Sequence, residues 1–401
     1  MTPDVIRLLL AAAALLALVM GTRSAAGLFV SPLNTATGVG LAGLGLAIAL
    51  GQLAQGIAQP PLGLLADRYG PRRVIVTGAW VLALATAILA AVQSVAAFAL
   101  AFILIAAAGS AVGGNSLVLA EVGRRVPAER RAVAFALVSA GGSAGQMVLA
   151  PATQASIDGI GWMPTLLAVA ALSLLALPLA RAFDGRVEPE HEAPSQSSPI
   201  AIGDAMRSPG FWASAGSFGI CGFHVGFLTT HMPGVIERCG INPSFAGPWL
   251  AVLGAANIAG SLAAGALLRH VSARAFLIAI FVLRAATIAL LLVLPATAPV
   301  LLGFAVLMGL SYMALLPAIS QQISESFGTE RLATLFGVVG LVHQAGSFAG
   351  VWLGGVLAES TGGDALTWVI DVALALLAVM LQCLAMRRAP PARVSLRMRH
   401  A

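Results

Sequence analysis

Residues 63–73 have the sequence GLLADRYGPRR and lie between two long apolar runs. The stretch begins with a glycine and ends with two arginines, and a carboxylate and a third arginine stand between them. A second glycine permits the tight turn that two closely spaced helices need. The pattern therefore predicts a short polar hairpin between two apolar helices. Its defining positions are Gly63, Asp67, Arg68, Gly70 and Arg72.

The chain as a whole is very apolar, since 59% of its 401 residues are hydrophobic and only 9% are charged. A soluble fold would expose that surface to water, so the composition excludes one. The strands of a membrane barrel are about half as long as the apolar runs and alternate in polarity, which excludes a barrel. A helix needs ~20 apolar residues to cross a bilayer. Twelve such runs predict an all-α membrane protein: 6–30, 41–66, 74–93, 98–120, 132–157, 163–183, 211–235, 245–268, 276–294, 300–323, 332–357 and 365–386.

The basic residues predict the orientation of these helices. All 22 are arginines, and nineteen of them fall on one side of the membrane if both termini lie on that side. The loops of the opposite side carry only Arg238. Short loops rich in arginine stay in the cytoplasm. We therefore expect a multi-pass protein of the bacterial inner membrane, surrounded by lipid, with both termini in the cytoplasm.

The chain divides into two similar halves. Residues 184–208 are rich in Glu, Pro and Ser, which is typical of a solvated linker. They separate an N-terminal six-helix bundle, residues 1–183, from a C-terminal bundle with a short basic tail, residues 209–401. Part of the hairpin pattern recurs in the second half, at residues 265–270. Parallel repeats of this kind, with a binding site at their interface, are typical of secondary transporters.

The hairpin resembles the loop between helices 2 and 3 of the major facilitator superfamily, whose pattern is Gly-x-x-x-Asp-Arg/Lys-x-Gly-x-Arg/Lys-Arg/Lys. The resemblance implies two pseudo-symmetric six-helix bundles that work by alternating access. It also implies that Asp67 meets the positive N-terminal end of span 11, near Thr329 and Arg331, and latches one conformation. In this role Gly63 allows a close helix contact and Gly70 the turn, and Arg68 and Arg72 complete the latch.

The segments around Arg23, His224, Arg284 and His343 resemble a bacterial branch of this superfamily. That branch is related to monocarboxylate carriers and oxalate/formate antiporters, and it also includes members linked to lipopeptide export. One departure concerns span 8, where proton-coupled monocarboxylate carriers place an Asp–Arg pair. This chain has Asn257 and no charge there, which argues against lactate-type transport.

Three charged residues lie inside predicted spans. Arg23 follows Arg7 by sixteen positions and thus lies ~24 Å further along its helix. A cation at that depth is costly, so we expect it to contact substrate, with outward snorkelling as the alternative. Arg284 is expected near the midplane, and Asp371 is a carboxylate well inside span 12. These two are expected either to form a structural ion pair or to serve function.

Histidines and amides supply the other candidate site residues. Because His224 and His231 are seven positions apart, they share one helix face. Histidine titrates near physiological pH and suits a proton carrier, although a packing role is equally compatible with each one alone. A cavity rich in amides and poor in carboxylates favours an anionic substrate. The predicted substrate-binding residues are Arg23, Asn115, Gln146, His224, His231, Asn257, Tyr312 and His343.

No pattern points to catalysis or to a bound cofactor. A chain without lysine has no Walker-type phosphate loop. The three cysteines and the histidines lack the spacing of a metal site. The arginines flank helix ends, which argues against nucleic acid. We expect a monomeric secondary transporter, not an enzyme, that moves a small organic anion such as a carboxylate, coupled to protons by symport or antiport. The alternative is efflux of a drug or an amphipathic lipopeptide.

Overall fold

A computed structural model of the chain describes residues 3–184, 202–327 and 332–386. Within them, twelve helices are long and apolar enough to cross a membrane, which confirms the expected number. The first half contains α1 (Pro3–Ser24), η1 (Ala25–Phe29), α2 (Val30–Thr37), α3 (Leu41–Tyr69), α4 (Pro71–Leu89), α5 (Val95–Gly113), α6 (Asn115–Arg125), α7 (Ala128–Ile160), α8 (Trp162–Ser173), α9 (Ala176–Leu179) and η2 (Ala180–Phe183). The second half contains α10 (Ile202–Arg207), α11 (Pro209–Arg238), η3 (Pro243–Phe245), α12 (Ala246–Leu267), α13 (Ala273–Val293), α14 (Ala298–Tyr312), α15 (Leu315–Phe327), α16 (Leu332–Thr361) and α17 (Ala365–Met386).

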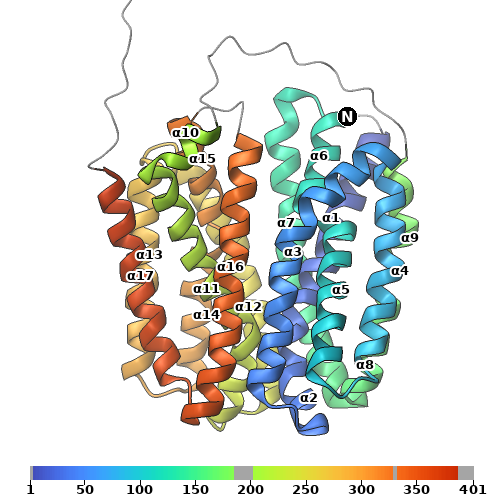
Figure 1. Ribbon diagram of the computed structural model, residues 1–401, viewed down its shortest axis with the longest axis vertical. Helices are drawn as coiled ribbons and strands as arrows, with labels where there is room; N and C mark the ends of the chain where they lie inside the picture. The colour runs from blue at the N-terminus through green and yellow to red at the C-terminus, as the bar shows by residue number, and fades with distance from the viewer. Residues whose placement is uncertain (1–2, 185–201, 328–331, 387–401) are drawn as a thin grey trace, which may run out of the picture.

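The helices form two bundles that stand side by side (Figure 1). One end of the molecule carries α10, α15 and α6, and we call it the α10 end. The other carries α2 and is called the α2 end. The predicted hairpin joins α3 to α4 through Gly70, which has a φ of 90°. The chain reverses at Gly70, the single residue between the two helices. Pro71 then fits the first turn of α4, because the N–H groups of that turn have no partner within the helix.

Several spans are interrupted where the sequence predicted continuous helices. The first span changes from α-helix to 3-10 helix directly after Ser24, the residue that follows Arg23, over η1. The tenth span ends as α14 at Tyr312 and resumes as α15 at Leu315. The fourth span breaks at Gly114, which has extended backbone angles. Such interruptions within a helix often mark hinges.

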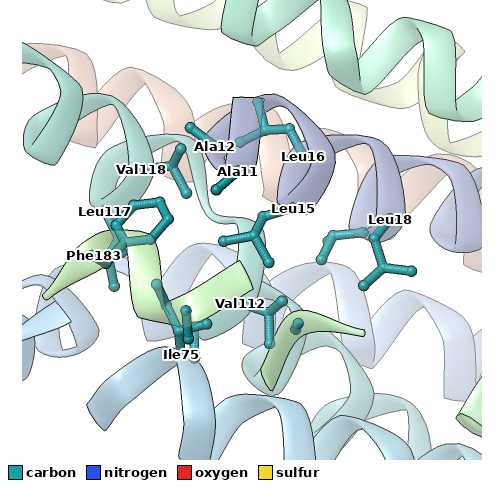
Figure 2. Packing of buried hydrophobic residues seen from close by; sticks show 14 of the residues in the cluster. Ala11, Ala12, Leu15, Leu16, Leu18, Ile75, Val112, Leu117, Val118 and Phe183 are labelled. Atoms are coloured by element: carbon teal, nitrogen blue, oxygen red, sulfur yellow. The ribbon is translucent and has the colours of Figure 1, made fainter. Parts of the chain in front are cut away.

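Each bundle has an apolar core built on closely packed helices. In the first bundle, Leu15 and Leu16 of α1 pack with Val112 and Val118 of α5 and α6 (Figure 2). Small residues let the helices approach: a Cβ placed on Gly145 of α7 would lie 2.0 Å from the carbonyl oxygen of Ala17. The second bundle repeats this arrangement between α11 and α16. There, a Cβ on Gly346 would lie 1.8 Å from the carbonyl oxygen of Gly219.

The two bundles meet at the α2 end, mainly through α3 against α16. A Cβ on Gly355 of α16 would lie 2.6 Å from the carbonyl oxygen of Leu41. Contacts continue to Gly56, whose Cβ would lie 3.0 Å from the Gln344 side chain. Nearer the α10 end, a Cβ on Gly63 of α3 or Gly337 of α16 would meet no atom of the described chain within 4 Å. Among the described residues, no close helix contact is made at Gly63 in this conformation, in which the bundles pack together at the α2 end.

Candidate functional site

A chain of hydrogen bonds joins the two bundles beside the first break in α1. The guanidinium of Arg23 donates from Nη2 to Oε1 of Gln52 on α3, at 2.5 Å. The backbone carbonyl of Gln52 accepts from Nε2 of Gln344 on α16, at 3.2 Å. Nδ1 of His343 donates in turn to Oε1 of Gln344, at 3.2 Å. We call Arg23, Gln52, His343 and Gln344 the central network.

The charge of Arg23 has no counter-charge in this network. Among the described residues, no carboxylate oxygen lies within 4.0 Å of its guanidinium nitrogens. An arginine has five N–H donors, and Gln52 accepts from one of them. Arg23 and His343 are half-buried, whereas Gln52 and Gln344 are buried. The network therefore presents a cation with free donor capacity at the junction of the bundles.

A second polar contact crosses the bundles between α7 and α12. Nδ2 of Asn257 donates to Oε1 of Gln146, at 3.3 Å, and both side chains are buried. In the described part of the chain, Oδ1 of Asn257 and Nε2 of Gln146 have no hydrogen-bond partner. A buried amide atom without a partner costs free energy unless a water, an ion or another polar group satisfies it. This amide pair thus offers one donor and one acceptor at the interface.

The three histidines do not share one site, although they were all predicted to bind substrate. His343 belongs to the central network. His231 donates from Nε2 to the carbonyl of Val351, at 2.8 Å, and lines a cavity of about 320 Å³ at the α2 end. His224 turns into the second bundle, where Nε2 donates to the backbone carbonyl of Asp371 at 3.1 Å. His224 and His231 belong to the same helix, but their rings contact different neighbours: α17 at His224 and α16 at His231.

Tyr312 and Asn115 complete the predicted set. The hydroxyl of Tyr312 donates to the carbonyl of Val225 on α11, at 3.2 Å, at the point where α14 ends. Asn115 begins α6, and its side chain lies outside what the structure describes. Their roles in substrate binding stay predictions.

The two buried charges of the second bundle do not form the ion pair that was one of two expectations. Arg284 donates to Oγ of Ser311 at 3.0 Å and to its carbonyl at 2.8 Å. Asp371 contacts His224 instead, with Oδ1 3.6 Å from Nε2. Within the described residues, no oxygen of Asp371 lies within 4.0 Å of an Arg284 nitrogen.

The predicted latch lies at the α10 end. Asp67 forms a salt bridge with Arg124 of α6, and Arg124 also pairs with Glu121 at 3.5 Å. Arg72 pairs with Asp184 at 2.8 Å. Arg68 places its guanidinium 5.3 Å from the ring centre of Tyr69. The partners expected for Asp67 on span 11, Thr329 and Arg331, lie outside the described residues.

Gln344 and Ser311 were not among the sequence candidates. Each is an ordinary polar residue whose importance depends on its partner, and no sequence pattern marks such a residue. No cluster of three His, Cys, Asp or Glu side chains suited to a metal is found in residues 3–184, 202–327 and 332–386.

Twelve apolar helices in two bundles, with a polar network at their junction, define a membrane transporter of the major facilitator fold. The profile of the Major Facilitator Superfamily matches residues 12–350 and 239–400, so the chain belongs to that superfamily.

Two curated proteins and a solved structure illustrate the relationship. The chain is 25% identical over 342 residues to the uncharacterized MFS-type transporter YcxA of Bacillus subtilis (strain 168), covering 80% of each chain. It is 26% identical over 208 residues to the oxalate:formate antiporter of Oxalobacter formigenes, covering 51% of this chain and 49% of that protein. The crystal structure of a bacterial homolog to the human lysosomal transporter Spinster, inward-facing and unoccupied, matches with a TM-score of 0.73 at 16% identity. That match covers 96% of this chain and 98% of the other.

Proposed function

We propose that this transporter moves a small organic anion, such as a carboxylate, across the bacterial inner membrane, and that Arg23 contacts the anion. The observation that carries the proposal is the half-buried guanidinium at the bundle junction with no carboxylate within 4.0 Å. A cation inside a membrane span is favourable only with an anionic partner or water, and a substrate carboxylate supplies the former. The partial relationship to an oxalate:formate antiporter supports the same substrate class.

We infer that transport proceeds by alternating access, which the two-bundle architecture supports. If the arginine-rich loops are cytoplasmic, the α10 end faces the cytoplasm and this conformation is closed to the outside. Residues 1–183 and 209–401 then rock about the central network, joined by the linker of residues 184–208. The two hydrogen bonds that cross this junction, Asn257–Gln146 and Gln344–Gln52, rearrange as it opens.

Proton coupling is the energy source that the site favours. His343 is half-buried and hydrogen-bonded within the network that holds Arg23, so a change in its protonation would alter the charge near the substrate. A monomer is sufficient for this mechanism, because each chain contains both bundles. Symport and antiport both remain compatible with the proposal.

Ligand-induced thermal stabilisation of the purified protein tests the substrate class. We expect small mono- or dicarboxylates to raise the melting temperature, and neutral or cationic compounds of the same size to have no effect. Arg23→Ala should weaken the apparent affinity by at least roughly tenfold, because one charge-assisted hydrogen bond is worth about 1.5–3 kcal/mol. Arg7→Ala, at an exposed position of the same span, is the matched control.

Counterflow in proteoliposomes completes the test. The carboxylate that stabilises the protein should exchange across the membrane in the wild type and in Arg7→Ala, but not in Arg23→Ala. Unchanged binding and exchange in a folded Arg23→Ala variant would refute the assignment. Stabilisation only by amphipathic lipopeptides or cationic drugs would favour efflux instead.

A further inference from the structure

Four polar side chains from four helices meet inside the second bundle, away from the central network. They are His224 of α11, Arg284 of α13, Ser311 of α14 and Asp371 of α17. None is more than 1% exposed. Arginine stays protonated in proteins, so this site holds a permanent positive charge in a dry environment. We call these residues the bundle cluster.

Three buried polar atoms of the bundle cluster have no hydrogen-bond partner among the described residues. In the described part of the chain, Oδ1 of Asp371, Nη1 of Arg284 and Nδ1 of His224 are buried without partners. An ionised carboxylate would be very unfavourable in this state, because a buried anion needs donors on its oxygens. An opposite charge is available on Arg284, yet the two do not form a salt bridge. The geometry therefore fits a neutral, protonated carboxyl group at Asp371.

Arg284 instead holds the break in the tenth span. Because α14 ends at Tyr312, the carbonyl of Ser311 is one of the last four of that helix and lacks an intrahelical partner. Arg284 donates to this carbonyl from Nη2 and to the Ser311 hydroxyl from Nε. A cation also interacts favourably with the negative end of a helix. Arg284 thus acts as the cap of α14.

The cap connects the cluster to the bundle junction. Tyr312, the residue after Ser311, donates to the carbonyl of Val225 on α11, beside His224. Tyr312 and His343 both lie within electrostatic range of Arg284 and of Arg23. Cys221 of α11 is a further titratable side chain near Tyr312. A movement of Arg284 would therefore change the hydrogen bonds at the helix break and the electrostatic environment next to the central network.

We propose that Asp371 is a second proton-binding group of this transporter, besides His343, and that its protonation decides whether Arg284 caps α14 or pairs with the carboxylate. With the proton bound, Asp371 is neutral and Arg284 remains on Ser311, as in this structure. When the proton leaves to water, the carboxylate attracts the guanidinium strongly in the low-dielectric interior, and α14 loses its cap. The imidazole of His224 lies beside the carboxyl group, with Nε2 3.6 Å from Oδ1 of Asp371.

This inference rests on the proposed function for its coupling role, but proton binding can be tested without any substrate. Infrared difference spectroscopy of the purified full-length protein, recorded during a rise in pH, reports the loss of protonated carboxyl groups. We expect a carboxyl C=O band in the wild type that disappears in Asp371→Asn and returns, shifted, in Asp371→Glu. Asp4→Asn, at an exposed carboxylate, is the control and should leave the band unchanged.

Transport assays then test the coupling. With a carboxylate identified through Arg23, we expect Asp371→Asn to retain counterflow exchange and to lose accumulation driven by a pH gradient, by roughly tenfold or more. Arg284→Met should lose both, because α14 lacks its cap in either protonation state. Melting temperatures identify any variant that fails to fold, and Asp371→Glu should then restore gradient-driven accumulation.

The outcomes separate the two proposals. If no carboxylate binds, the anion proposal fails while the infrared result still decides on Asp371. Identical infrared spectra for wild type and Asp371→Asn would overturn the proton site even if Arg23 binds an anion. Equal loss of exchange and accumulation in a folded Asp371→Asn variant would show a structural role and would also overturn it.

Discussion

The carboxylate of Glu359, near the end of α16, accepts a hydrogen bond of 2.8 Å from the backbone N–H of Ala42, in the first turn of α3. The bond joins one bundle to the other at the α2 end. A carboxylate at a helix N-terminus satisfies an orphan N–H group and interacts favourably with the helix dipole. Gly40, with a φ of 89°, allows the chain to enter α3 directly beneath this carboxylate. Glu359 therefore stabilises closure of the α2 end.

Removal of this contact should open the α2 end. Glu359→Ala loses an interaction worth about 1 kcal/mol, which corresponds to a roughly fivefold shift between the two conformations. A cysteine introduced by Ser31→Cys, in the cavity at that end, reports the opening through its rate of labelling by a polar maleimide. Cys239→Ala removes the exposed native thiol nearby.

Glu237→Ala is the matched control, since Glu237 is an exposed carboxylate that lines the same cavity. It should leave the labelling rate of the Ser31→Cys thiol within about twofold, because exposed charges contribute little to the free energy. Equal rates in the Glu359→Ala and Glu237→Ala variants would show that the Glu359–Ala42 bond does not control closure.

Much of the fold could be predicted because it depends on long-range averages along the chain. The predicted runs 41–66 and 365–386 differ from the helices Leu41–Tyr69 and Ala365–Met386 by a few residues at most. Hydropathy summed over ~20 residues is a robust signal. The interruptions after Arg23 and Tyr312 were missed, because each depends on a few side-chain hydrogen bonds and not on hydropathy.

The candidate site was less predictable because its partners are distant in sequence. Arg23 and Arg284 could be recognised as unusual from their predicted depth in the membrane alone. Their partners could not: Gln52 lies 29 residues from Arg23, and Ser311 lies 27 residues from Arg284. Which helix covers His224 is likewise set by tertiary packing, so its separation from His343 was not visible in the sequence.

The opposite end offers a complementary prediction. If Asp67 latches the conformation that is closed at the α10 end, Asp67→Asn should shift the equilibrium toward the present one. Labelling of the Ser31→Cys thiol should then slow by up to roughly fivefold, the equivalent of about 1 kcal/mol at a helix N-terminus. The salt bridge of Asp67 with Arg124 is exposed, so its loss should change the melting temperature little. Faster labelling, or the same slowing in Asp4→Asn, would contradict the latch.

Helix contacts at glycine predict opposite effects for two substitutions in α16. Gly346→Ala should destabilise the protein by about 1–3 kcal/mol, because its Cβ would lie 1.8 Å from the backbone oxygen of Gly219. Gly337→Ala meets no described atom within 4 Å and should stabilise the helix by up to about 1 kcal/mol. Thermal unfolding in detergent measures both. A Gly346→Ala variant as stable as wild type would disprove the tight contact between α11 and α16.

Cys239, at the end of α11, should react slowly with alkylating reagents. Partial burial raises the pKa of its thiol, the nearby carboxylate of Asp364 raises it further, and Arg238 opposes them. Because the thiolate is the reactive form, a raised pKa leaves less of it at pH 8, and the rate should keep rising at higher pH than for a free thiol.

Asp364→Asn removes the carboxylate and releases Arg238 from its 2.6 Å salt bridge, so it should accelerate alkylation. Residue-resolved mass spectrometry separates Cys239 from Cys383, and Asp158→Asn serves as the control. A slower rate in Asp364→Asn would show that the local charges act in the opposite sense.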